Sequence, residues 1–161
     1  MKITIFYSLL VLLCPICLAE PLVEGAFDTI NISADEAIED EKPGVLHLRG
    51  NFMMQSESWH LTSSQATVYG SPTKPDRILL QGSPARFTFL PGDEVGADKI
   101  EASALEVEYQ RQDNSLMLTG KARLLLGEET IYSSSIRYDI TANRYLAGGD
   151  NGVNIKLPPK D

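Results

Sequence analysis

The sequence predicts an all-β protein of antiparallel strands, arranged as a sandwich, a jelly roll or an open barrel-like roll. Two observations support this fold class. From Ile30 onward, turn-forming residues recur roughly every 8 to 14 residues. Between them, apolar residues alternate with polar ones, as in strands that have one buried face. The predicted turns are Lys42-Pro43-Gly44, Gly50-Asn51, Gly70-Ser71-Pro72, Gly82-Ser83-Pro84, Pro91-Gly92-Asp93, Asp113-Asn114, Gly127-Glu128 and Gly148-Gly149.

Residues 1–19 have the layout of a cleavable signal peptide. Lys2 precedes an apolar run over residues 3–13, and Cys17-Leu18-Ala19 places small residues before a cut after Ala19. The alternative, a retained membrane anchor, is weaker because the run is shorter than the roughly 20 residues that span a bilayer. We expect a lead-in at 20–29, one domain at 30–159 and a tail at 160–161.

Cleavage would change the composition of the working protein. Lys2 is the only charged residue in the signal, so removing 19 of 161 residues leaves 142 residues and shifts the net charge from -8 to -9. Cys14 and Cys17 leave with the signal, and the mature protein then contains no cysteine. It would therefore fold in an oxidising compartment without disulfides.

The segment from Ser33 to Ile38 permits two interpretations. Ser33 followed by Glu36 resembles a helix capping box. An internal repeat with an offset of 70 residues instead favours a strand, because its second copy at Ser103 runs into strict alternation. We therefore predict two related β halves, each too small to bury its own apolar face, with a short helix at Ser33–Ile38 as the alternative. The matching pairs are Ile30-x-x-Ser33-Ala34 and Ile100-x-x-Ser103-Ala104, Leu46-x-Leu48-x-Gly50 and Leu116-x-Leu118-x-Gly120, and Ser63-Ser64 and Ser133-Ser134.

Three segments show the period-2 alternation most clearly, and each is predicted as a strand. The segment 71–76, which contains two prolines, is instead predicted as a longer surface loop. The apolar positions of the three strands are Ala85, Phe87 and Phe89; Leu105, Val107 and Tyr109; and Val153, Ile155 and Leu157.

Charge and motif content argue against nucleic-acid binding and against catalysis. The sequence pI is about 4.7, whereas phosphate binding needs clustered Lys and Arg. The chain has two histidines, His47 and His60, which are too few for a zinc site, so we predict no metal and no cofactor. Glu106 and Glu108 would lie about 7 Å apart on one strand face, but that face is polar, and we interpret it as solvated. We predict that the protein is not an enzyme.

The remaining feature is a large set of apolar residues on one side of the predicted strands. Such a set forms either an ordinary core or the interior of an open roll that accepts acyl chains. Composition does not separate these two interpretations.

The order of the sequence motifs resembles the LptA/OstA family over about residues 30–159. No single motif is specific to the family. The order and spacing of the motifs, behind a predicted signal peptide, are what carry the resemblance. The matching runs are Ile30-Asn-Ile-Ser-Ala-Asp-Glu-Ala, Gly44-Val-Leu-His-Leu-Arg-Gly-Asn51, Ser64-Gln-Ala-Thr-Val-Tyr69, Gly82-Ser-Pro-Ala-Arg-Phe87, Pro91-Gly92, Ile100-Glu-Ala-Ser-Ala104, Leu116-Met-Leu-Thr-Gly-Lys-Ala-Arg-Leu124, Ile136-Arg-Tyr-Asp139 and Val153-x-Ile-x-Leu-Pro-Pro159.

The resemblance implies a fold and a function. The fold is an open antiparallel β-jellyroll, also called a β-taco. The function is periplasmic transport of lipopolysaccharide from the inner to the outer membrane, with the acyl chains of lipid A held in an apolar groove. The implied partners are an LptC-like inner-membrane protein, an LptD-like outer-membrane protein and further copies of this chain, joined head to tail. The alternatives are an LptC-like anchored component and a secreted β-sandwich module that binds carbohydrate or protein.

The resemblance also implies two sets of site residues. An apolar groove shields acyl chains by burying CH₂ groups at about 0.8 kcal/mol each, and unpaired strand edges can join two chains by strand addition. The predicted groove residues are Ile30, Ile32, Leu46, Leu48, Phe52, Phe87, Tyr109, Leu116 and Leu118. The predicted assembly edge consists of Ile30, Asn31, Ile32, Val153, Asn154, Ile155, Lys156 and Leu157.

Overall fold

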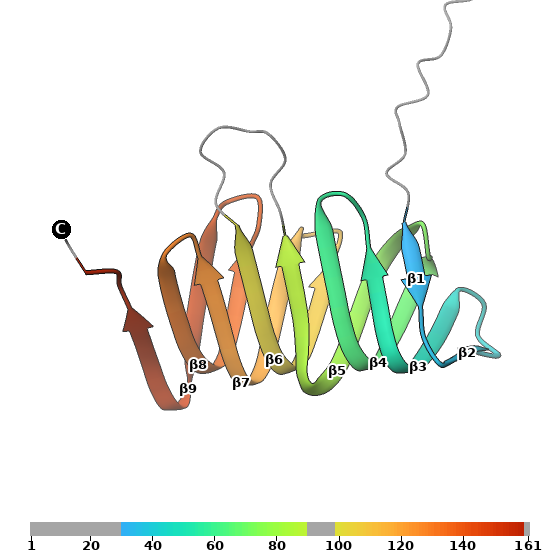
Figure 1. Cartoon of the computed structure of the whole chain (residues 1–161), viewed down its shortest axis with the longest axis horizontal. Helices are drawn as coiled ribbons and strands as arrows, with labels where there is room; N and C mark the ends of the chain where they lie inside the picture. The colour runs from blue at the N-terminus through green and yellow to red at the C-terminus, as the bar shows by residue number, and fades with distance from the viewer. Residues whose placement is uncertain (1–29, 90–98, 160–161) are drawn as a thin grey trace, which may run out of the picture.

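The computed structural model describes residues 30–89 and 99–159, which form one antiparallel sheet of nine strands (Figure 1). The predicted all-β open antiparallel fold is confirmed. No helix in the described residues is long and apolar enough to cross a membrane. The strands are β1 Asn31–Ser33, β2 Glu36–Glu39, β3 Val45–Gln55, β4 Trp59–Ser71, β5 Lys74–Phe89, β6 Ile100–Gln110, β7 Ser115–Leu126, β8 Glu129–Asp139 and β9 Arg144–Lys156.

Strands that are neighbours in the sheet are nearly all neighbours in the sequence. The order is β1-β3-β4-β5-β6-β7-β8-β9, and β2 also pairs with β3. Ile32 of β1 lies opposite Met54, whereas Ala37 of β2 lies opposite Leu48, so β1 and β2 cover different halves of β3. Together β1 and β2 form one end of the sheet, and β9 forms the other.

The long strands β3 to β9 bend at mid-length (Figure 1), and each bend coincides with a break in the pairing register. Such breaks occur between Arg49 and Phe52 in β3 and between Thr119 and Ala122 in β7. Gly50 and Gly120, which lie in these breaks, have φ angles of 70° and 79°, a conformation that glycine adopts without a steric penalty. Bulges of this kind bend a strand sharply. The sheet therefore folds over into two walls that face each other.

We call these the near wall, which faces the viewer in Figure 1, and the far wall behind it. The near wall consists of residues 31–33, 52–55, 59–62, 85–89, 100–103, 122–126, 129–133 and 153–156. The far wall consists of residues 36–39, 45–49, 65–71, 74–81, 106–110, 115–119, 135–139 and 144–148.

The core lies between the two walls and is built from alternate residues of each strand. Ala85 and Phe87 are buried as the alternation predicts. Leu105 is an exception, because the register break between Ser103 and Glu106 shifts the alternation by one residue. As a result Ala104 is buried, and Leu105 is 43% exposed on the outside.

The predicted turns divide into two groups. Turns are present near 42–44, 70–72, 113–114 and 127–128. The predictions at Gly50-Asn51, Gly82-Ser83-Pro84 and Gly148-Gly149 are wrong, because these residues lie inside long strands at the register breaks that bend the sheet. Glycine and proline therefore mark bulges here as well as turns.

Two further predictions concern segments with ambiguous signals. The longer loop predicted at 71–76 is wrong: β4 continues to Ser71 and β5 begins at Lys74, so the turn between them is tight. The segment Ser33–Ile38 contains the end of β1 and most of β2, which confirms the strand over the helix. The predicted signal at 1–19, the lead-in at 20–29, the turn at 91–93 and the tail at 160–161 lie outside the described residues.

The 70-residue repeat coincides with equivalent strand pairs. Ile32 pairs with Met54, and Ala102 pairs with Leu124. In the same way, the pair Leu48 and Ala66 corresponds to the pair Leu118 and Ile136. The division into two related halves remains a prediction that these registers support.

Candidate functional site

An apolar cavity of about 340 Å³ lies between the two walls. It stands on the side away from the bends, because Trp59 begins β4 and Phe89 ends β5. Its size falls in the range of small-molecule binding sites. The lining residues are Ile30, Trp59, Leu61, Thr73, Lys74, Pro75, Ile78, Phe87, Phe89, Tyr109, Arg111, Asn114 and Ile140.

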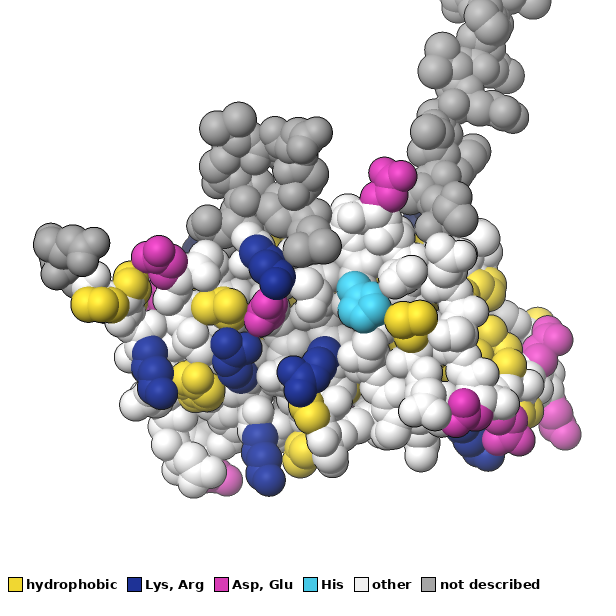
Figure 2. Space-filling view, viewed as in Figure 1, with side chains coloured by type: hydrophobic (Ala, Val, Ile, Leu, Met, Phe, Trp, Pro, Cys, Tyr) yellow, Lys and Arg dark blue, Asp and Glu magenta, His cyan; other side chains and the backbone are white. Residues whose placement is uncertain are grey.

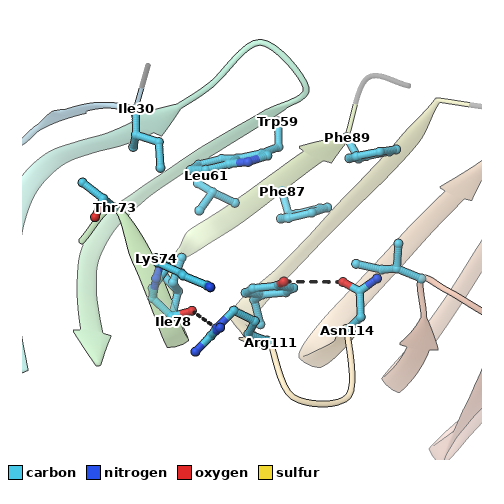
Figure 3. Close-up of a pocket in the computed structure, with 13 residues that line it drawn as sticks. Ile30, Trp59, Leu61, Thr73, Lys74, Ile78, Phe87, Phe89, Arg111 and Asn114 are labelled. Carbon is cyan, nitrogen blue, oxygen red and sulfur yellow. Dashed lines mark hydrogen bonds between the residues drawn. The ribbon is translucent and has the colours of Figure 1, made fainter. Parts of the chain in front are cut away.

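Aromatic side chains dominate the near-wall side of the cavity (Figure 3). Trp59 lies opposite Phe89 in the pairing of β4 with β5, and Leu61 lies opposite Phe87. These four residues occupy alternate positions on their strands, so they share the inner face. They form a continuous apolar surface of the kind that buries hydrocarbon.

The far-wall side combines apolar side chains with one tyrosine hydroxyl. Ile78 of β5 lies opposite Tyr109 of β6. Tyr109 donates a hydrogen bond of 3.4 Å to Oδ1 of Asn114 in the following turn. Burial raises the pKa of the Tyr109 phenol, so this group remains a neutral donor at neutral pH. The polar group is thereby directed to the rim and leaves the interior apolar.

Two cations stand at the far-wall mouth of the cavity, Lys74 and Arg111. Arg111 is held by a hydrogen bond of 3.1 Å from its Nε to the carbonyl of Pro75 and by an ion pair with Asp76. Lys74 makes no ion pair with any described residue. The mouth therefore places positive charge beside an apolar interior, which suits an amphiphilic ligand.

At the β9 end of the sheet, the two walls are joined by a side-chain hydrogen bond. Tyr145 of the far wall donates to Oε1 of Glu129 in the near wall at 3.0 Å. Burial and this hydrogen bond raise the pKa of the Tyr145 phenol. A second bond, of 2.9 Å, runs from the hydroxyl of Tyr138 to Asn143 in the next turn. The interior is therefore closed by polar contacts at this end, whereas the cavity opens nearer β4 and β5.

The structure separates the predicted groove residues into two groups. Ile30, Phe87 and Tyr109 line the cavity, and Ile32 packs half-buried against the core. The others pack among core residues: Leu46 is partly buried, while Leu48, Phe52, Leu116 and Leu118 are buried. Contact of any of these residues with a lipid remains a prediction.

Several cavity residues were not among the site residues predicted from the sequence. Trp59 and Leu61 alternate with His60 and Thr62, a signal that could have placed them on the inner face. Phe89 belonged to a predicted strand but not to the site. Lys74 and Arg111 had no signal, because their position depends on the turns that follow β4 and β6.

The two predicted edge segments lie at opposite ends of the strand order. β1 contains Asn31 and Ile32, and β9 contains 153–156. Val153 and Ile155 of β9 are 45% and 47% exposed because this strand pairs on one side only, and Leu157, directly after β9, is 70% exposed. An exposed edge of this length can accept a further strand. Assembly through these residues remains a prediction.

The polar residues considered for catalysis or metal binding have structural partners. Nε2 of His47 lies 2.8 Å from Asp40, and Nδ1 lies 3.2 Å from the Thr67 hydroxyl. Arg77 binds Glu108 at 2.7 Å and lowers the pKa of that carboxylate, as expected for an ionised partner rather than a general acid. No group of three His, Cys, Asp or Glu suited to a metal ion occurs in the described residues.

The sequence and the fold are both similar to known proteins. The chain is 25% identical over 130 residues to the lipopolysaccharide export system protein LptH of Pseudomonas aeruginosa, a match that covers 80% of this chain and 73% of LptH. Its fold matches the crystal structure of LptH, described as the LptA homologous periplasmic component of the conserved lipopolysaccharide transport device. That match has a TM-score of 0.71 and 23% identity, and it covers 82% of this chain and 96% of the LptH chain.

A protein family described as LptA/(LptD N-terminal domain) LPS transport protein matches residues 31–144. This range covers well over half of the chain and includes every strand from β1 to β8. The family is one of transport proteins, which confirms the prediction that the chain is not an enzyme. The chain therefore belongs to the LptA/(LptD N-terminal domain) family of lipopolysaccharide transport proteins.

Proposed function

We propose that the protein carries lipopolysaccharide across the periplasm by holding its acyl chains between the two walls. The observation that carries this proposal is the cavity, whose near-wall side is formed by Trp59, Phe87 and Phe89. Each CH₂ group that leaves water for such a surface contributes about 0.8 kcal/mol. The described turns at the rim each join two strands of the same wall. The walls can therefore part at the rim to admit longer chains.

We further propose that copies of the chain, or the chain and its LptC-like and LptD-like partners, join edge to edge. The exposed β9 supports this, because its outer backbone groups have no strand partner among the described residues. Strand addition from β9 of one copy to the β1 and β2 end of the next would align their interiors. A predicted signal peptide and the periplasmic location of LptH support a periplasmic site.

Site-specific photo-crosslinking in cells tests the cargo. A photo-reactive residue at Phe87, which is 6% exposed and lines the cavity, is expected to give a lipopolysaccharide adduct. The matched control is Met117, which lies between the buried Leu116 and Leu118 and therefore faces outward. Adducts at Met117 in place of Phe87 would refute binding between the walls.

A further inference from the structure

The outer surface of the near wall carries a group of basic side chains, which we call the basic face (Figure 2). On β5 and β7, Arg86 lies between the buried Ala85 and Phe87, and Arg123 lies between the buried Ala122 and Leu124. Both arginines therefore point away from the interior. The basic face consists of Arg86, Lys99, Lys121, Arg123 and Lys156.

Few acidic groups compensate this charge. Glu101 lies 2.6 Å from Lys99 and 3.7 Å from Arg123, so one carboxylate serves two cations. Arg86, Lys121 and Lys156 make no ion pair with any residue in the described ranges. Lys156 instead stands over the ring of Tyr132, 5.3 Å from its centroid. The basic face therefore has an excess of positive charge.

On the outer surface of the far wall, most arginines are paired with carboxylates, and only Arg144 makes no ion pair with a described residue. Arg49 pairs with Glu36 at 3.8 Å, and Arg77 pairs with Glu108 at 2.7 Å. Arg137 likewise pairs with Asp113, in the turn after β6, at 3.1 Å. The chain as a whole has a net charge of -8. The unpaired cations of the basic face therefore give this surface a charge of the opposite sign to that of the whole protein. Charge separation of this kind produces a local field that attracts anions.

The cations are spread over a sheet rather than gathered in a pocket. In the pairing registers Arg86 lies opposite Ser103, which lies opposite Arg123, so the two arginines are two strands apart. Lys156 on β9 is a further two strands away. With about 4.8 Å between strands, the cations recur about every 10 Å. This arrangement fits an extended surface of repeated negative charges.

We propose that the basic face docks on an anionic phospholipid surface. Charge complementarity favours a partner that is rich in phosphate groups. The spacing of about 10 Å between the cations favours a partner whose phosphate groups lie side by side over an extended surface. The core of a stable protein–protein interface is depleted of charge and enriched in apolar and aromatic side chains. The basic face lacks such a core: the apolar side chains on this outer surface, such as Leu125 of β7, are separated by the cations (Figure 2), and Tyr132 is the one aromatic residue there among the described positions. Docking there leaves the cavity between the walls and the free backbone edge of β9 available, although Lys156 itself lies on β9.

Vesicle flotation with the purified protein tests this proposal. The vesicles contain equal parts of phosphatidylglycerol and phosphatidylcholine, or phosphatidylcholine alone, and no lipopolysaccharide, so the result does not depend on cargo. We expect binding to the anionic vesicles alone, weakened by salt. The variant Arg86→Gln/Arg123→Gln/Lys156→Gln is expected to bind on the order of 100-fold less, at about fivefold per cation.

The control is Arg49→Gln/Arg137→Gln/Arg144→Gln, which removes the same charge from far-wall positions. It is expected to bind as the unmodified protein does, and thermal unfolding monitored by circular dichroism verifies that both variants are folded. Equal losses in the two variants, equal binding to neutral vesicles or no binding to anionic vesicles would each overturn the proposal. In the last case, an acidic protein would be the better candidate occupant.

Discussion

The hydroxyl of Tyr145 lies 3.0 Å from Oε1 of Glu129 and connects the far wall to the near wall at the β9 end of the sheet. The two residues are separated by the bend of β8 and by the turn that leads into β9. In the part of the chain that the structure describes, backbone hydrogen bonds run along each wall but do not join the walls across the interior. The distance between the walls at this end therefore depends on side-chain contacts. The hydrogen bond between Tyr145 and Glu129 is a polar contact beside the apolar core.

Removing the Tyr145 hydroxyl is expected to destabilise the fold modestly. A hydrogen bond of this kind contributes about 1 kcal/mol, so Tyr145→Phe should lower the free energy of unfolding by about that amount in urea titrations. Tyr109→Phe is the control, since its hydroxyl makes only a longer bond of 3.4 Å within one wall. A larger loss for Tyr109→Phe would contradict a role for Tyr145 in joining the walls.

Stability should decline at alkaline pH. Burial raises the pKa values of Tyr109 and Tyr138 above their ordinary 10.0, and burial together with the bond to Glu129 raises that of Tyr145. The folded protein keeps phenol protons that the unfolded chain releases. The tyrosine contribution is therefore complete below about pH 10 and is lost as pH rises through the folded values.

Urea unfolding at about pH 8 and about pH 11 measures this effect, with tyrosinate absorbance as the second readout. Tyr138→Phe removes one of the shifted groups and should make the alkaline decline shallower. A decline of the same size in this variant would assign the alkaline instability to other groups.

The sequence was sufficient to predict the fold class but not the shape of the sheet. Alternation over residues 85–89 places Phe87 inside correctly, because strand periodicity depends on local geometry alone. The same rule fails at Leu105, since a bulge adds one residue to the strand and reverses the faces. Glycine and proline signals indicate that the chain deviates from a regular strand, but they do not distinguish a turn from a bulge.

The candidate site was predictable only in part, for a related reason. Phe87 and Tyr109 are found by alternation and resemblance, whereas Leu116 and Leu118 satisfy the same criteria and are fully buried. Distance from the bends does not distinguish them, because Leu116 lies directly opposite Tyr109 in the register. Phe87 and Tyr109 belong to β5 and β6, beside the cavity, whereas Leu116 and Leu118 belong to the next strand, β7. The cavity lies at the strand ends beside the rim, and that position depends on where every strand folds over.

A charge at the cavity rim should impair lipid binding without unfolding the protein. Phe89 lines the cavity near the end of β5, and its neighbour Thr88 points outward. Phe89→Asp is expected to weaken lipopolysaccharide binding at least about tenfold, because an ionised carboxylate would have to be desolvated. Thr88→Asp adds the same charge outside and should have little effect.

The single tryptophan provides the measurement. Trp59 is the only tryptophan in the chain and lines the cavity, so its emission should shift to shorter wavelength as lipopolysaccharide fills the space around it. Titration of the unmodified protein and of both variants then gives three affinities. Binding in the cavity requires a lower affinity for lipopolysaccharide in Phe89→Asp than in Thr88→Asp. If the two variants bind lipopolysaccharide equally well, the cavity is not the binding site.

The bend of β7 depends on Gly120. Its φ is 79°, and a Cβ placed there would lie 2.9 Å from Leu105 Cδ1. Gly120→Ala is therefore expected to lower the free energy of unfolding by about 1 to 3 kcal/mol through backbone strain. Gly148→Ala is the control, because a Cβ added at that glycine would meet no atom within 4 Å and its φ is not positive.

A double variant separates strain from contact. Leu105→Ala removes Cδ1 and Cγ, which would lie 2.9 and 3.1 Å from the added Cβ, but keeps Leu105 Cβ at 3.1 Å. The combination with Gly120→Ala should therefore recover the part of the loss that is due to crowding by Cδ1 and Cγ. The part that remains measures the left-handed backbone together with the contact to Leu105 Cβ. Complete recovery would show that crowding alone requires glycine at this position.

Self-association should depend on the free side of β9. Natural edge strands avoid pairing by carrying inward-pointing charges, and Ile155 is 47% exposed at this edge. Ile155→Lys is therefore expected to weaken assembly, shifting the monomer–oligomer transition in a dilution series on size exclusion to higher protein concentration. Leu105→Lys adds the same charge at a similarly exposed position away from both sheet ends, so it should leave the transition unchanged. If both variants shift the transition equally, net charge rather than strand addition controls association, and a protein that remains monomeric at every concentration would exclude self-assembly through β9.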